Sequence, residues 1–147
     1  MQIARWIHLL GVVVWVGGMF FAHMALRPAV QTLPPPQRLA LLTATLTHFL
    51  RWVAVAIVAI LSSGIALIVM LGGMREVSHA VHVMVGLGLL MMLIFAHIAA
   101  APFRRLRAAV AAGEWERAGA AMALVRKLVA INLVLGLLTI TVAVVGH

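Results

Sequence analysis

The sequence predicts an all-α integral membrane protein: a single domain, residues 1–147, of four membrane-spanning helices in an up-down-up-down bundle. Hydrophobic residues make up 65% of the chain and charged residues only 10%. Four stretches contain no Asp, Glu, Lys or Arg, namely 6–26, 52–74, 77–103 and 128–147. Each has about the 20 residues that an α-helix needs to cross a bilayer core roughly 30 Å thick. Backbone polar groups in lipid must be paired within their own segment, so we expect these stretches to be helices.

The first half of the chain predicts two of these helices and a proline-rich connection. The stretch 6–26 is expected to be a retained helix, because Arg27-Pro28 does not resemble the small-residue cleavage site of a signal peptide. Three consecutive prolines at 34–36 end one segment. Proline also suits the first turn of a helix, so the second helix is expected to begin near Pro36 and to project beyond the membrane before entering it.

The second half predicts the same arrangement. The third helix covers 77–103, and Pro102 permits a kink or an end there. The fourth helix is expected to start at about Gly113 and to run into the apolar stretch 128–147. No carboxylate lies in any of the four apolar stretches, so acid–base catalysis by a carboxylate pair is excluded within them.

The chain also contains a weak internal repeat. A shift of 74 positions places two histidines and a proline of the first half on identical residues of the second, and six residues are identical between 5–28 and 79–102. We therefore expect two copies of one helical hairpin, 1–73 and 75–147, in parallel orientation about an axis along the membrane normal.

The basic residues that give the chain its net charge of +8 are unevenly distributed between the two sides of the predicted bundle. Nine of the eleven basic residues lie in the first and third connections, and only Arg5 and Arg75 lie on the other side. This distribution places both termini in the periplasm and the two basic connections in the cytoplasm. It indicates a lipid bilayer as the partner, and no nucleic acid.

The repeated histidines predict a cofactor site. Cysteine is absent, which excludes thiolate ligation and iron–sulfur clusters. His8 and His82 lie at equal depth near the periplasmic ends of two parallel helices, on faces expected to turn inward. Gly11 and Gly18 are expected to leave space for a flat macrocycle beside the first helix. We therefore predict that His8 and His82 are the axial ligands of a b-type haem between helices one and three.

A second pair, His23 and His97, lies about 22 Å deeper at 1.5 Å per residue. Fifteen residues turn an α-helix by roughly 60° beyond whole turns, so this pair drifts off the face of the first. One haem per chain is expected, and a second at His23 and His97 is left open. His79 and His48 are expected at the membrane interfaces.

Other polar residues in the helices have both structural and functional interpretations. Arg51 and Arg126 are expected to anchor the helices at the membrane surface, or to pair with a haem propionate or another anion. Asn132 is expected to form a hydrogen bond between helices. The nine methionines fill core space in one interpretation and bind soft Cu(I) in the other.

The string from Trp6 to Gly18, WIHLLGVVVWVGG, resembles the first helix of the small CopD-like membrane proteins, which are related to the HemJ family. Helix four, with Arg126 and Asn132 followed by LVLG, looks similar too. The resemblance implies a bacterial inner-membrane bundle, with copper handling suggested by CopD and a bound haem by HemJ. The third-helix lysine of HemJ falls at about Met84, and the acidic residue after its asparagine is Leu133, so protoporphyrinogen oxidase activity is not predicted.

Two functions remain open from the sequence. The first is a membrane cytochrome with haem b, whether or not it acts as an oxidoreductase, serving a quinone or a redox protein. The alternative is a copper-binding or copper-uptake protein that uses His and Met. A homodimer is compatible with either function.

Overall fold

The computed structural model describes residues 1–146 as helices joined by short turns; His147, the last residue of the predicted second repeat, lies outside the described residues. The first membrane segment comprises α1 (Gln2–Phe21), a π-helical turn (Ala22–Leu26), α2 (Arg27–Ala29) and a 3₁₀ turn (Val30–Thr32). The other segments are α3 (Pro35–Met70), α4 (His79–Ala100) continued by α5 (Pro102–Ala111), and α6 (Trp115–Val145). All four segments are long and apolar enough to cross a membrane, so the described chain is a multi-pass four-helix membrane bundle, as predicted.

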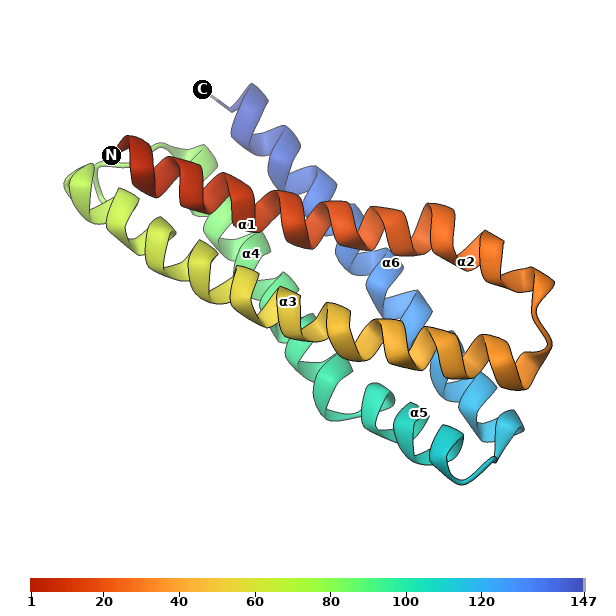
Figure 1. The fold of residues 1–147 in the computed structure, drawn as a ribbon. Helices are drawn as coiled ribbons and strands as arrows, with labels where there is room; N and C mark the ends of the chain where they lie inside the picture. The colour runs from red at the N-terminus through yellow and green to blue at the C-terminus, as the bar shows by residue number, and fades with distance from the viewer. Residues whose placement is uncertain (147) are drawn as a thin grey trace.

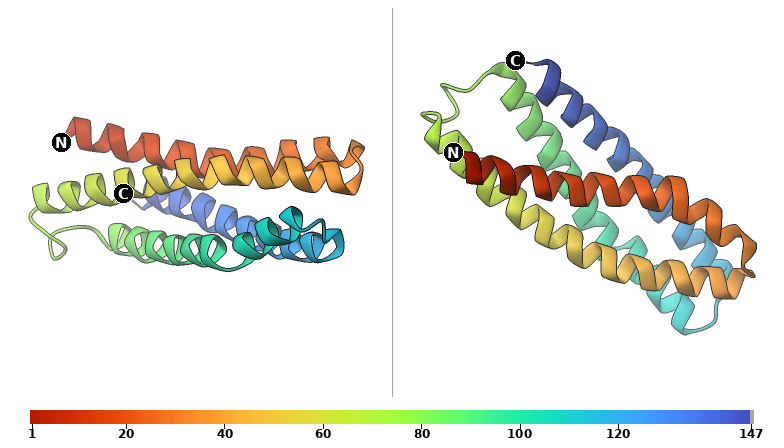
Figure 2. Two further views of the ribbon diagram at one scale, coloured as in Figure 1. Left: turned by 60° about the horizontal axis from the view of Figure 1, so that its bottom comes forward. Right: turned by 45° about the horizontal axis from the view of Figure 1, so that its top comes forward.

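The segments alternate in direction (Figures 1 and 2). α1 packs mainly on α3, and α4 and α5 pack mainly on α6. The N-terminus, the α3–α4 turn and the end of α6 lie at one end of the bundle, which we call the terminal end. The other end carries α2, α5 and the start of α6, and we call it the basic end.

Helices begin at prolines where the sequence predicts. α3 begins at Pro35, with the ring inside the first helical turn. α4 ends at Ala100 and α5 begins at Pro102, because Ala101 departs from helical geometry at φ −123° and ψ −81°. α6 begins at Trp115 after a turn in which Gly113 adopts a positive φ of 69°, a conformation that favours glycine.

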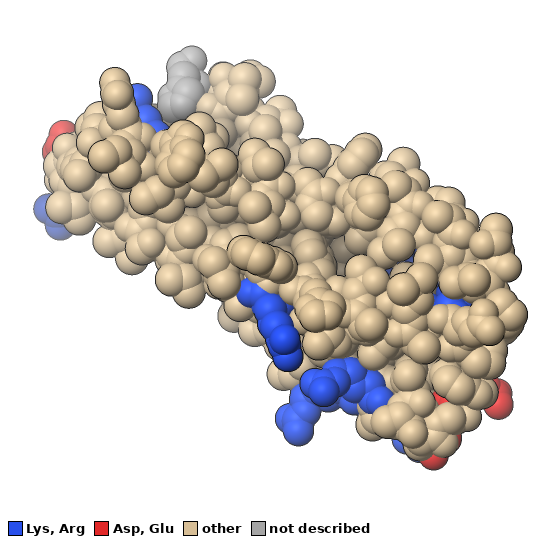
Figure 3. All heavy atoms as spheres, viewed as in Figure 1, with Lys and Arg blue, Asp and Glu red and all other residues tan. Residues whose placement is uncertain are grey.

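Two groups of buried side chains form the core. One lies at the basic end and joins α3, α4, α5 and α6 through Leu46, Ile98, Leu106 and Val125. The other lies nearer the middle of the bundle, where Trp15, Met19, Val53, Met91 and Leu133 pack together. Most other large apolar side chains face outward, and the surface in Figure 3 is largely uncharged, as a lipid-facing surface requires.

Two glycines of α1, Gly11 and Gly18, allow close contact with α3. A Cβ atom at Gly11 would lie 2.7 Å from Cγ1 of Ile60, and one at Gly18 would overlap the ring of Phe49. The Cβ positions of these two glycines, where the sequence predicted room for a macrocycle, are therefore taken by side chains of α3. This correction follows from helix packing, since small residues let neighbouring backbones approach.

Candidate functional site

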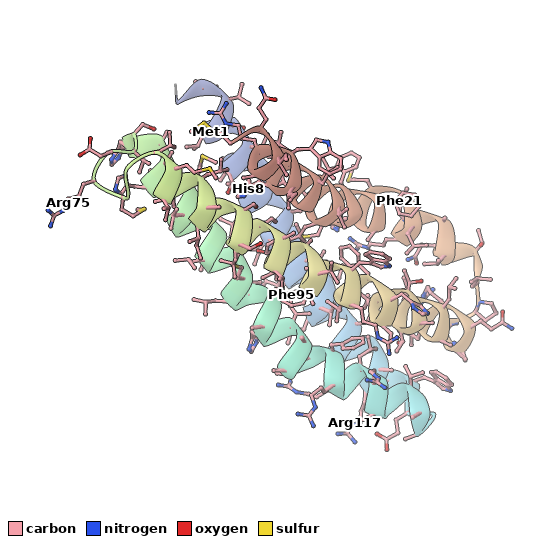
Figure 4. The ribbon with its side chains drawn as sticks, turned by 60° about the vertical axis from the view of Figure 1, so that its left-hand side comes forward. Met1, His8, Phe21, Arg75, Phe95 and Arg117 are labelled. Carbon is pink, nitrogen blue, oxygen red and sulfur yellow. The ribbon has the colours of Figure 1, made fainter. Side chains whose placement is uncertain are left out.

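His8 is held against α3 near the terminal end (Figure 4). Its Nδ1 lies 3.2 Å from the carbonyl oxygen of Ile60 and 3.2 Å from Oγ of Ser63. A carbonyl oxygen only accepts, so Nδ1 carries the proton and Nε2 keeps its lone pair. Gly64 makes room for the ring, because a Cβ there would lie 3.4 Å from Cε1 of His8. Histidines that ligate metals commonly have their other nitrogen held by a carbonyl in the same way.

His82 has a separate environment. It is exposed, and its Nδ1 lies 3.0 Å from the carbonyl oxygen of Ser78 in its own first turn. The predicted inward face of the third helix is wrong by about half a turn: the buried residues of α4 are Met91 and Ile98. Nine residues separate His82 from Met91, about two and a half turns, so the two side chains leave opposite faces.

The two histidines of the second predicted pair, His23 and His97, also lie in different surroundings. His23 lies in the π-helical turn, is half-buried and lines a cavity at the basic end. His97 is exposed on α4. Only the last two of the fifteen steps from His8 to His23 enter the π-helical turn, so the drift expected for a regular helix largely remains.

The remaining predicted site residues fall into two groups. Arg51, His48 and His79 are exposed, as expected for interfacial residues. Arg126 is half-buried and lines the cavity with His23.

The middle of the bundle buries two methionines and an amide side chain. Met19 and Met91 are buried in one cluster, at 2% and 3% exposure. Asn132 on α6 donates from Nδ2 to the carbonyl oxygen of Met91 at 3.2 Å, which confirms the predicted bond between helices. Its Oδ1 is buried and has no hydrogen-bond partner among the described residues. Trp15 and Phe95 meet edge to face beside this cluster, with ring centroids 6.3 Å apart (Figure 4 labels Phe95).

A cavity of about 340 Å³ lies at the basic end between the first segment, α3 and α6. Its polar side carries Arg27, Arg38, Arg126, His23 and Gln31. Apart from Thr45, its other walls are apolar and extend to Gly18, Phe49 and Val129. The cavity therefore combines positive charge at one end with an apolar interior.

Several of these residues were not predicted from the sequence as site residues. Arg27 and Arg38 contributed to the count of basic residues that sets topology, and nothing in their spacing indicates a shared cavity. Ser63 is one of two adjacent serines in an apolar stretch. A polar residue there could have been matched to His8 by depth, since α1 and α3 are antiparallel neighbours.

Within residues 1–146, no three His, Asp or Glu side chains are grouped so as to hold a metal ion. Metal binding by this part of the chain therefore depends on methionine sulfur or on fewer than three such ligands. Soft thioether sulfur favours Cu(I).

Comparison with known protein families identifies a relationship for most of the chain. The family model of copper resistance protein D, CopD, matches residues 43–146, which is more than half of the chain. This range includes α4, α6 and most of α3, with Ser63, Met91 and Asn132. No curated protein and no solved structure matches the chain. The chain belongs to the copper resistance protein D family.

Proposed function

We propose that this protein binds copper within the membrane and passes it along the bundle. The family match carries the proposal. The donor set supports it, because His and Met are the side chains that suit Cu(I) in a chain without cysteine, and the bundle buries Met19 and Met91 in one cluster. Copper is here the cargo of the protein.

The central copper position in this proposal lies at Met19 and Met91. In this proposal the two thioethers supply soft ligands for Cu(I), and Oδ1 of Asn132 is a further buried acceptor with no hydrogen-bond partner among the described residues. Neutral ligands suit a buried site, because they add no charge that the lipid environment would penalise. Thr139, two turns after Asn132 on α6, has its Oγ1 3.9 Å from the sulfur of Met91.

The histidines of α1 provide positions on either side of this centre. His8 precedes Met19 by eleven residues, about 16 Å along a helix, and presents a free Nε2. His23 follows Met19 by four residues, about one turn, and lines the cavity at the basic end. The three residues form a series of donors along one helix.

The proposed orientation places both termini in the periplasm of a bacterial inner membrane and the basic end in the cytoplasm. It rests on the nine basic residues of the two connections at that end. Reporter fusions at residues 75 and 110 test it and should report periplasm and cytoplasm, respectively. The same side for both, or the reverse assignment, would refute the orientation.

Haem ligation by His8 and His82, and by His23 and His97, is the competing prediction. Each of His8 and His82 has its Nδ1 against a carbonyl oxygen and its Nε2 available. The space predicted for the macrocycle is occupied by Ile60 and Phe49. Copper handling therefore has the stronger support.

Anaerobic titration of the purified protein with Cu(I), against a competing chelator, tests the copper proposal. Met91→Leu keeps the volume of the core and removes the sulfur, so it should weaken binding by about tenfold or more. Met24→Leu is the matched control, because Met24 is exposed at 57%, and it should bind as the unmodified protein does. Equal affinity in the unmodified protein, Met91→Leu and Met19→Leu would refute the methionine site.

A further inference from the structure

The cavity at the basic end contains a concentration of positive charge from three separate elements. Arg27 begins α2, Arg38 lies in the first turns of α3, and Arg126 lies on α6. All three side chains are half-buried and line the same cavity. The fold therefore holds three guanidinium groups around one space.

No acidic side chain of the described residues offsets these charges at the cavity. The residues that line it include no Asp or Glu. The ion pair found within residues 1–146 joins Arg117 and Glu114, both outside the cavity lining. Like charges held together destabilise one another, and a bound anion would convert this repulsion into attraction.

The geometry of the polar side suits an oxyanion of the phosphate type. Guanidinium groups donate paired hydrogen bonds to phosphate oxygens, and three of them can surround one such group. A second hollow of about 260 Å³ adjoins it and shares His23, Arg27, Gln31 and Arg126. The polar side thus extends past the cavity toward Pro28 on the first segment.

The apolar side of the cavity distinguishes a lipid from a free anion. From the arginines the cavity continues along Leu46 and Phe49 of α3 and Val129 of α6. A free phosphate would leave this apolar volume without a partner, whereas an acyl chain would fill it. Basic pockets between membrane helices bind phospholipid head groups in this way.

We propose that this cavity binds an anionic phospholipid of the adjacent leaflet, with its phosphate on Arg27, Arg38 and Arg126 and an acyl chain along Phe49 and Val129. The lipid would join the first segment to α3 and α6 at the basic end. The proposal does not depend on copper, so it stands or falls separately from the proposed function.

Native mass spectrometry of the delipidated protein tests the proposal, with phosphatidylglycerol and phosphatidylcholine of identical acyl chains as probes. Phosphatidylglycerol should bind in a one-to-one complex and more tightly than phosphatidylcholine. The double variant Arg27→Gln/Arg126→Gln should weaken its binding by about tenfold or more, as expected when charged hydrogen bonds are lost. The matched control Arg104→Gln/Arg105→Gln removes two exposed charges of the same end and should leave binding unchanged.

A second variant tests the cavity without altering charge. Gly119 lines the cavity, and a Cβ there meets nothing within 4 Å, so Gly119→Leu should fill the space and exclude the acyl chain while the protein still folds. Gly86→Leu on α4 is its control, since a Cβ at Gly86 also meets nothing within 4 Å. Lipid binding should fall in Gly119→Leu and persist in Gly86→Leu.

Two further probes separate the sources of the anion. Inorganic phosphate at millimolar concentration should not displace the lipid; displacement would assign the site to a free anion and overturn the lipid proposal. Haem should not displace the lipid either, and a one-to-one haem complex lost in Arg27→Gln/Arg126→Gln would assign the arginines to propionates instead. Equal binding of the two lipids would also overturn the lipid proposal. An unchanged lipid affinity in both Arg27→Gln/Arg126→Gln and Gly119→Leu would do the same.

Discussion

The two hairpins of the bundle carry histidines at matching positions and use them differently. His8 in the first hairpin is half-buried and bonded to α3, whereas His82, 74 positions later, is exposed and bonded to its own turn. The partner positions explain the difference. Ser63, which contacts His8, is 4% exposed, and position 137 of the second hairpin is a leucine that is 47% exposed. A repeated residue therefore does not imply a repeated contact.

The two hairpins also differ at their basic ends, which are proposed to face the cytoplasm. In the first hairpin the chain remains helical past His23, through a π-helical turn, and brings Arg27 to the cavity. In the second, the position that matches Arg27 is Ala101, where the helix breaks. The position that matches Arg38 is Ala112. The charge of the cavity thus comes from the first hairpin and from Arg126.

The largest expected effect on stability is at the contact between α1 and α3. Gly11→Leu should destabilise the protein by about 3 kcal/mol or more, because the new side chain meets Ile60 and the carbonyl of Ala56 in a packed interface. Gly86→Leu in the second hairpin should change stability by less than about 1 kcal/mol, because its surroundings are open. Unfolding in mixed micelles measures both. Equal destabilisation by the two substitutions would show that the hairpins pack alike.

A smaller effect is expected at the interhelical amide. Asn132→Ala removes the bond to the Met91 carbonyl and leaves a small void, at a cost of about 1 to 2 kcal/mol. Val58→Ala, at the matching position of the first hairpin, should cost less than about 0.5 kcal/mol, because Val58 is 67% exposed. An equal loss at both positions would contradict the assignment of Asn132 as a tie between α4 and α6.

The smallest expected effect on stability tests the difference between His8 and His82. His8→Ala should lower the free energy of unfolding by about 0.5 to 1.5 kcal/mol, since it loses its hydrogen bonds to α3. His82→Ala should have no measurable effect on stability. A double-mutant cycle of His8→Ala with Ser63→Ala should show coupling. Additive changes in that cycle would mean that the two side chains do not interact in the membrane.

Much of the fold follows from the sequence, because membrane spans depend on length and composition. The charge-free stretches predict the four segments, and the prolines at 34–36 and Pro102 predict where helices begin and end. The rotation of α4 could not be predicted in this way. Its 22 residues carry no charge and are apolar on all sides, so hydrophobic periodicity gives no phase, and His82 was expected on the wrong face.

The site was less predictable than the fold for a related reason. Asn132 was expected to join helices because a buried amide in lipid needs a partner. The cavity depends on three arginines from three elements, and their approach is a consequence of tertiary packing. Arg126 was singled out from its depth in helix four, whereas Arg27 and Arg38 resemble ordinary topology determinants in the sequence.

The metal content and visible spectrum of the protein purified from copper- and haem-replete cells test the central claim most directly. The copper proposal predicts that copper is retained and that no Soret band is present. Copper should be lost in Met91→Leu and kept in Met24→Leu. A colourless protein without copper, or a Soret band that disappears in both His8→Ala and His82→Ala, would contradict the account, and the second result would establish the bis-histidine haem in its place.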